Sequence, residues 1–210
     1  MRCPGFDHED ELRSQGYRLI AGVDEVGRGA IAGPVAAGAV ILPCDGDVSW
    51  ATKVKDSKQL SPSQRELLSP LICNNAVAVG VGFVPSEEVD TLGILEATRL
   101  AMAKAIQGLL CQPDFLLIDA LRLPSVSKPQ RSVIHGDQIS VSIACASIVA
   151  KVARDQWMIA MDREYPGYFL ADHKGYGTKK HLLSLERLGP CALHRRSFAP
   201  IRRLPELPGR

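Results

Sequence analysis

Short apolar runs that end in acidic residues are the feature that most constrains this chain. Runs of this length and composition predict buried strands, and open α/β sheets bind ligands at the carboxyl ends of their strands. An α/β fold of this kind would gather the acids at one edge of a sheet. The four acids that stand at or just beyond such runs are Asp24, Glu25, Asp119 and Asp137.

The rest of the chain alternates between strand and helix patterns. Ser61 followed by Pro62 is a strong helix start, because serine caps the first turn and proline suits the first helical position. The strands are expected over 18–26, 35–42, 76–84, 115–120 and 131–134, and the helices over 62–69, 94–110, 139–165 and 178–188. The second strand is rich in Ala and Gly, so another element should pack closely on it.

The length of 210 residues and the hydrophobic content of 46% suit a single domain that spans 1–210. We expect a core over 17–190 and a basic tail over 191–210 that lies as a strap on the surface. The N-terminal residues lack a signal peptide pattern and no apolar run could span a membrane, which favours a cytoplasmic protein. The net charge of +2 means that any nucleic-acid surface must concentrate its basic residues.

The cysteines are scattered singly, which argues against a zinc site or a disulfide framework and favours buried thiols. They are Cys3, Cys44, Cys73, Cys111, Cys145 and Cys191. The clustered acids instead predict a site for Mg²⁺ or Mn²⁺, because these ions prefer oxygen ligands and would offset the repulsion among the carboxylates. Two ions about 4 Å apart could activate water and stabilise the leaving oxygen at phosphorus, giving a 5′-phosphate and a 3′-hydroxyl.

One geometric difficulty concerns Asp24 and Glu25. Neighbouring residues on a regular strand point to opposite faces of the sheet, so both can reach one site only if the strand ends or bulges there. The glycines that follow, Gly27 and Gly29, would make such a break inexpensive. Glu25 could also contribute its backbone carbonyl.

Several polar segments could bind a phosphate backbone. Gly27-Arg28-Gly29 offers backbone amides and a planar cation, and Tyr176, flanked by glycines, lysines and histidines, suits stacking on a sugar or base. The loop that contains Lys58 could contact phosphate or could simply be solvated surface. Ser147 and Lys151 lie on one face of the long helix, which could form a ridge facing the site, or Lys151 could pair with Asp155 at the surface.

These segments occur in an order that resembles bacterial ribonuclease HII. The resemblance extends from about Tyr17 to Arg203 and rests on 22–29, Asp56-Ser57-Lys58-Gln59-Leu60, 118–120, 136–137, 146–151, Arg154-Asp155 and His173-Lys174-Gly175-Tyr176-Gly177-Thr178. It implies a ribonuclease H-like fold with a mixed five-stranded sheet flanked by helices. It also implies endonucleolytic cleavage of RNA in RNA–DNA hybrids, and cutting at single ribonucleotides embedded in duplex DNA.

By matching positions, the resemblance implies that the four acids bind metal and carry catalysis. Gly27, Arg28 and Gly29 would read the ribonucleotide 2′-hydroxyl and the adjoining phosphate, Tyr176 would stack on the next deoxynucleotide sugar, and Lys58 would contact phosphate. The chain ends soon after its basic tail, whereas some relatives carry a further helical extension. Only 23 residues precede Asp24, which leaves no room for the extra N-terminal domain of type 3 enzymes.

We expect this nuclease to be a monomer without membrane contact. Two other functions would use part of the same pattern. A module that only binds hybrid duplexes would need the basic loops but not four clustered acids. An enzyme acting on a small phosphorylated metabolite would need a compact cationic site. The wide sequence separation of Lys58, Lys151, Lys174 and Arg195 instead favours a long substrate groove.

Overall fold

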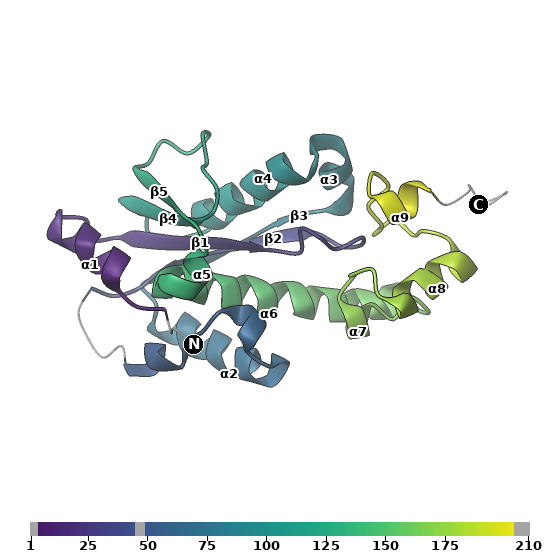
Figure 1. Ribbon diagram of the computed structural model, residues 1–210, viewed down its shortest axis with the longest axis horizontal. Helices are drawn as coiled ribbons and strands as arrows, with labels where there is room; N and C mark the ends of the chain where they lie inside the picture. Colours follow the sequence, from purple (N-terminus) through teal and green to yellow (C-terminus); the bar gives the residue numbers. More distant parts are fainter. Residues whose placement is uncertain (1–3, 45–48, 204–210) are drawn as a thin grey trace.

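The computed structural model describes residues 4–44 and 49–203 and contains a mixed five-stranded sheet in the order β3-β2-β1-β4-β5 (Figure 1). Its first three strands are antiparallel, and the other two run parallel to β1. The strands are β1 (Ile20–Val26), β2 (Val35–Ile41), β3 (Ala78–Val84), β4 (Phe115–Asp119) and β5 (Gln130–Val133). The predicted fold class is therefore confirmed.

Helices cover both faces of the sheet. On one face lies α4 (Ile94–Gln107), and on the other lies α6 (Val141–Glu164) with α2 (Pro62–Asn75) packed against it (Figure 1). The remaining helices are α1 (Asp7–Ser14), α3 (Ser86–Leu92), α5 (Gly136–Ile139), α7 (Leu170–His173), α8 (Lys179–Leu188) and α9 (Ala199–Arg202), with two 3₁₀ turns, η1 (Ser49–Lys53) and η2 (Ser57–Gln59). No helix in the described parts of the chain is long and apolar enough to cross a membrane.

Glycines allow α6 to approach the sheet closely. A Cβ atom on Gly22 of β1 would lie 2.1 Å from the carbonyl carbon of Ser142, and one on Gly38 of β2 would lie 2.4 Å from the carbonyl oxygen of Ala146. Both distances are far too short for any side chain. The close approach of the α6 backbone thus requires glycine at these positions. The close packing on the Ala- and Gly-rich β2 was predicted from the sequence.

Two helix predictions were wrong at the C-terminal end of the helix. The first helix does not end at Ser69, because α2 continues past Pro70 to Asn75 and buries Ile72 against the core. The helix expected over 94–110 ends at Gln107.

The helix expected over 139–165 corresponds to α6 within two residues at each end, and the Ser140 hydroxyl accepts a hydrogen bond from Ile143 N and caps α6. The buried carboxylate of Glu9 from α1 accepts a further hydrogen bond from Ser142 N.

The basic tail is not a surface strap over its described part. His194 and Arg195 are buried, α9 forms at Ala199–Arg202, and Ile201 belongs to the apolar cluster around Met158 of α6. Residues 204–210 lie outside the described residues. Its basic, proline-rich composition predicts a strap on the surface. Nothing in that composition indicates that Arg195 donates to backbone carbonyls inside the protein.

The cysteine prediction was correct for bonding but not for burial. The five described cysteines are free thiols, yet only Cys145 is buried, Cys73 is exposed, and the other three are half-buried. Cys3 lies outside the described residues. Scattered spacing thus predicted the absence of disulfides among these five, but did not predict which of them would reach the core.

Candidate active site

Three carboxylates meet where β1 and β4 reach the same edge of the sheet. One oxygen from each of Asp24, Glu25 and Asp119 lies within 4.8 Å of the others. The parallel pairing of β1 with β4 ends at Val23 and Ile118, so the next residue on each strand, Asp24 or Asp119, lies at the edge. The sequence prediction that strand ends deliver these acids to one place is confirmed for this trio.

The expected break in the strand is absent. Pairing of β1 with β2 continues in regular register through Asp24, Glu25 and Val26, with no bulge. The two side chains therefore start on opposite faces of β1. They converge because β4 has already ended beside them, which leaves the edge open for the longer Glu25 side chain to reach the others. The prediction of a break at Asp24 and Glu25 was wrong because it rested on the geometry of β1 alone, whereas the point at which β4 ends decides which side chains can meet.

The cluster is electrostatically strained without a cation. Burial and the neighbouring Glu25 charge raise the pKa of Asp24 well above its usual range. Burial also raises the pKa of Glu25, against the opposing effect of Arg28, and it raises the pKa of Asp119. Each carboxylate is thus held where its charged form is disfavoured.

The donor set fits a hard divalent cation. The ligands are all carboxylate oxygens, and the Glu25 Oε2 atom is buried with no hydrogen-bond partner in the described structure. A buried unpaired carboxylate oxygen is costly unless something positive satisfies it. Its other oxygen, Oε1, lies 3.3 Å from Arg28 Nη1. Mg²⁺ and Mn²⁺ match such oxygen-rich sites.

The fourth predicted acid, Asp137, lies beside this trio but is not part of it. It stands in the first turn of α5, is buried, and accepts a hydrogen bond from Lys58 Nζ at 3.3 Å. Its charge contributes to the raised pKa of Asp119, after burial of that carboxyl group. Asp137 and Lys58 therefore form an ion pair at the border of the cluster.

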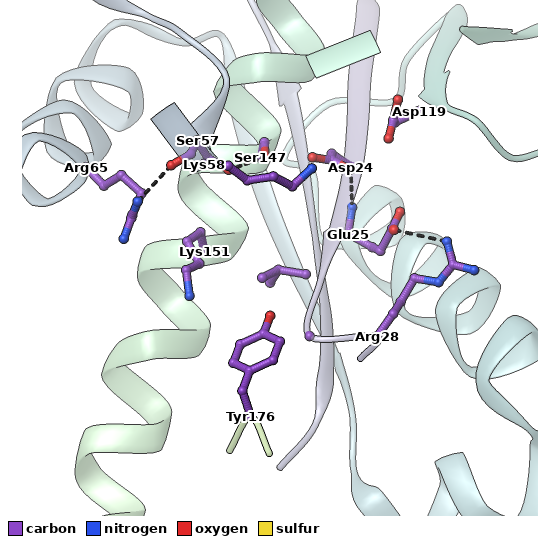
Figure 2. A pocket seen from close by; sticks show the side chains of 12 residues that line it. Asp24, Glu25, Arg28, Ser57, Lys58, Arg65, Asp119, Ser147, Lys151 and Tyr176 are labelled. Carbon is purple, nitrogen blue, oxygen red and sulfur yellow. Dashed lines mark hydrogen bonds and ion pairs between the residues drawn. The ribbon is translucent and has the colours of Figure 1, made fainter. Parts of the chain in front are cut away.

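The carboxylates line one pocket of about 240 Å³ together with cationic and aromatic side chains (Figure 2). Six predicted substrate contacts line it, whereas Gly29 and Asp137 do not. The lining residues are Asp24, Glu25, Val26, Gly27, Arg28, Ser57, Lys58, Arg65, Asp119, Ser147, Lys151 and Tyr176. They come from β1, β4, η2, α2, α6 and the loop before α8, which explains why no local sequence window contains the site.

No role in the site was predicted for three of the lining residues. Ser57 lies within a recognised motif, and its hydroxyl is 2.9 Å from the Ser147 hydroxyl on α6. Arg65 of α2 donates to the carbonyls of Ser57 and Leu60. Position along the helix gave no signal for Arg65, because only the fold of η2 onto α2 brings it to the pocket. Val26 was treated only as part of the strand.

The α6 ridge faces the pocket, and the expected pair of Lys151 with Asp155 is also present, although it is half-buried and not at the surface. Contact of the ridge with substrate phosphate stays a prediction. Ser147 and Lys151 face the pocket, as Figure 2 shows, and Lys151 Nζ also pairs with Asp155 Oδ1 at 2.7 Å. Lys151 Nζ further lies 5.7 Å from the centre of the Tyr176 ring. The ion pair therefore holds the lysine along the pocket wall next to the tyrosine.

Two buried arginines fix the loop that follows β1. Arg154 of α6 donates to the carbonyls of Pro34, Ala32 and Lys174, and it occupies the space where a Cβ on Gly27 would lie. Arg195 donates to the carbonyls of Gly33 and Arg28. Burial and the nearby Arg154 charge lower the pKa of Arg195 to about 9.

The suggested cationic groove is therefore smaller than the sequence indicated. Arg195 is fully buried, and Lys174 bonds to the carbonyl of Ala171 and does not line the pocket. The histidines near Tyr176 are buried as well and do not present cations to a ligand. Only Lys58 and Lys151 of the four cations line the cavity.

Comparisons with known proteins point to one family. The family model described as Ribonuclease HII matches residues 21–201. The chain is 54% identical over 200 residues to a "Ribonuclease HII" of Dehalococcoides mccartyi, covering 95% of this chain and 94% of that protein. It is 51% identical over 195 residues to a "Ribonuclease HII" of Listeria monocytogenes, covering 93% of this chain and 73% of that protein.

Solved structures share the fold at lower identity. Ribonuclease H2 from Pyrococcus horikoshii OT3 superposes with a TM-score of 0.73 at 24% identity, covering 88% of this chain and 95% of that one. Bst-RNase HIII in complex with Mn²⁺ superposes with a TM-score of 0.67 at 19% identity, covering 89% of this chain and 68% of that one. At these identities the likeness supports the fold alone.

Proposed function

Because this chain belongs to the ribonuclease HII family, we propose that it cuts duplex DNA 5′ to single embedded ribonucleotides, in addition to the RNA of RNA–DNA hybrids. Membership makes it a metal-dependent nuclease with ribonuclease H activity. The observation that carries the finer proposal is the presence of the carboxylate trio and the Gly27-Arg28 loop in one pocket. A binding-only module would have no use for the trio.

Metal binding falls to Asp24, Glu25 and Asp119, with Asp137 completing the set from α5. The unpaired Glu25 oxygen and the all-oxygen donors support Mg²⁺ or Mn²⁺. When bound, these ions supply an activated water and stabilise the leaving 3′ oxygen, so that the products are a 5′-phosphate and a 3′-hydroxyl. Lys58 neutralises Asp137 and lies where it can contact a substrate phosphate.

Recognition of the 2′-hydroxyl falls to Gly27-Arg28-Gly29. Arg28 and Gly29 are exposed, and their backbone amides donate no hydrogen bond within the described structure. Free amides next to a half-exposed guanidinium suit both a hydroxyl and a phosphate. Tyr176 lines the same pocket, where its ring can stack on the next sugar, while Ser147 and Lys151 line the wall on α6, on the side away from Arg28 (Figure 2).

We further propose that the enzyme is a monomer. The named relatives are bacterial proteins, and bacterial DNA lies in the cytoplasm, which supports a cytoplasmic location. Its substrates would then be RNA–DNA hybrids and duplex DNA that contains ribonucleotides.

The central test is Asp119→Asn. We expect cleavage of a duplex with one ribonucleotide to fall by about a hundredfold or more with Mg²⁺ or Mn²⁺, because losing even a residue that only supports a metal ligand typically costs about 10- to 100-fold. Binding of the same duplex, measured by fluorescence anisotropy, should remain. Asp172→Asn is the matched control, since this exposed carboxylate pairs with Lys180 away from the pocket.

A second substrate tests the reading loop within the same experiment. The wild-type enzyme should leave the duplex uncut when the ribonucleotide is replaced by its 2′-deoxy equivalent. Equal cutting of the two duplexes would refute the role given to Gly27-Arg28-Gly29, and full activity of Asp119→Asn would refute the catalytic site.

A further inference from the structure

Three buried histidines lie directly behind the tyrosine loop. His173 ends α7, His181 lies in the first turn of α8, and His194 lies in the tail segment. Their exposed fractions are 8%, 0% and 2%. The His173 ring stacks on the His181 ring at 4.2 Å, and the His181 and His194 rings are 5.2 Å apart.

The hydrogen bonds define one tautomer for each ring. Cys191 N donates to His194 Nδ1 at 3.0 Å, so the proton of His194 is on Nε2. That Nε2–H can only donate to His181 Nε2, 3.0 Å away, which places the His181 proton on Nδ1. His181 Nδ1 in turn donates to the carbonyl oxygen of Tyr176 at 3.0 Å. We call this chain, from Cys191 through His194 and His181 to Tyr176, the histidine relay.

The third histidine braces the other side of the same loop. Gly175 N donates to His173 Nδ1 at 3.2 Å, which leaves the His173 proton on Nε2 to donate to the Tyr168 carbonyl at 2.9 Å. The Tyr176 backbone N donates to the His173 carbonyl. Burial lowers the pKa of both His181 and His194 to about 4, so both rings are neutral at pH 7 and the relay is intact.

We propose that His181 and His194 are positioning residues that fix Tyr176 for substrate stacking, through the hydrogen bond from His181 Nδ1 to the Tyr176 carbonyl. The inference rests on the stacking role proposed for Tyr176. Neither histidine lines the pocket, so neither can touch substrate. The relay instead ties the tail, which also carries Arg195, to the one aromatic ring of the pocket.

A Tyr176 ring that is already fixed in place loses less conformational entropy when substrate binds. Loss of this fixation should therefore change the KM for a duplex with one ribonucleotide more than it changes kcat. Loss of one buried hydrogen bond corresponds to a rise in KM of about three- to tenfold. A merely structural role would instead lower stability and leave the KM of the folded enzyme unchanged.

Two variants of His181 each keep one of its two hydrogen bonds and remove the other. In His181→Asn the amide nitrogen takes the place of Nδ1 and still donates to Tyr176, but the acceptor for His194 is lost, so we expect KM to rise less than in His181→Gln. In His181→Gln the amide oxygen takes the place of Nε2 and still accepts from His194, but the donor to Tyr176 is lost, so KM should rise. Thermal unfolding of both variants shows whether stability explains the difference.

A double-mutant cycle with Tyr176→Ala completes the test. If His181 acts through the ring, His181→Gln should raise KM in the wild-type background and leave it unchanged once the ring is gone. Equal KM values for His181→Asn and His181→Gln, or an undiminished effect in the Tyr176→Ala background, would overturn the inference. A wild-type KM for Tyr176→Ala alone would instead show that the stacking role is wrong.

Discussion

At the scale of single residues, the site depends as much on absent side chains as on present ones. Gly22 lies two positions before Asp24 on the same face of β1, and there α6 leaves no space for a Cβ atom. Gly27 leaves its space to the Arg154 side chain. The sequence indicated close packing on the strands, but could not show that an arginine more than a hundred residues away fills the space beside Gly27.

We predict that Gly22→Ala destabilises the protein by about 1–3 kcal/mol or more, because its Cβ would lie 2.1 Å from the Ser142 backbone. The measurement is the free energy of unfolding in urea. Gly29→Ala is the matched control, since no heavy atom lies within 4 Å of its added Cβ, and it should change stability by less than about 0.5 kcal/mol. Similar losses in both variants would contradict the close approach of α6.

At the scale of elements, the sequence predicted what local patterns determine. The five strands appear within a few residues of their expected bounds, and Ser61 and Gln64 form a full capping box at the start of α2. The prediction for the end of α2 failed because tertiary packing overrides the local signal and carries the helix past Pro70. Glu9 of α1 holds the start of α6 at Ser140 and Ser142.

The candidate site was predictable to a similar extent. Carboxylates at strand ends identified Asp24, Glu25 and Asp119, because strand direction alone brings them to one edge. The pairing of Asp137 with Lys58 and the entry of Arg65 into the pocket depend on how η2, α2 and α5 pack together. The sequence showed histidines on both sides of Tyr176 but gave no sign of their burial, which lowers the pKa of His181 and makes it a neutral hydrogen-bonding group.

The relay between α8 and the tail predicts a pH dependence of stability. The pKa values of His181 and His194 are about 4 in the folded protein against an ordinary value of 6.5. The unfolded chain therefore binds more protons between these values, and stability that is complete above pH 6.5 is lost progressively toward pH 4. His194→Gln keeps the donor to His181 and cannot titrate in this range.

We expect His194→Gln to reduce the slope of unfolding free energy against pH in this window, as measured by urea unfolding at several pH values. The carboxylates Asp24, Glu25 and Asp119 have raised pKa values, so their contribution has the opposite sign and is present in the variant as in the wild type. An unchanged slope in His194→Gln would contradict a neutral relay.

At the scale of the whole molecule, the C-terminal segment completes a site that begins at residue 24. Arg195 binds the carbonyls of Arg28 and Gly33, and the relay reaches Tyr176 from Cys191. The two segments proposed to read the substrate therefore depend on contacts from residues 191–195. The basic composition of this segment concealed its structural role.

We predict that Arg195→Met lowers the free energy of unfolding by about 2–4 kcal/mol, because the two carbonyls of Gly33 and Arg28 lose their donor. It should also raise the KM for a duplex with one ribonucleotide, since the loop around Arg28 loses its support. The neighbouring Arg196→Met is the control, because Arg196 is exposed and holds Asp90 through its backbone amide, which the substitution keeps. Equal stability of the two variants in urea would contradict the buried role of Arg195.

The bond from Arg195 to the Arg28 carbonyl joins residues separated by 167 positions and also has a consequence during synthesis. A ribosome releases the N-terminal part of a chain first, so the carboxylate strands emerge long before the residues that fix the reading loop and the tyrosine. A nascent chain that has emerged only as far as Asp137 would hold the acids proposed to bind metal, but not the contact that fixes the Arg28 carbonyl. Under the proposed function, selection of ribonucleotides would therefore develop later in synthesis than the carboxylate cluster, once Arg195 has emerged.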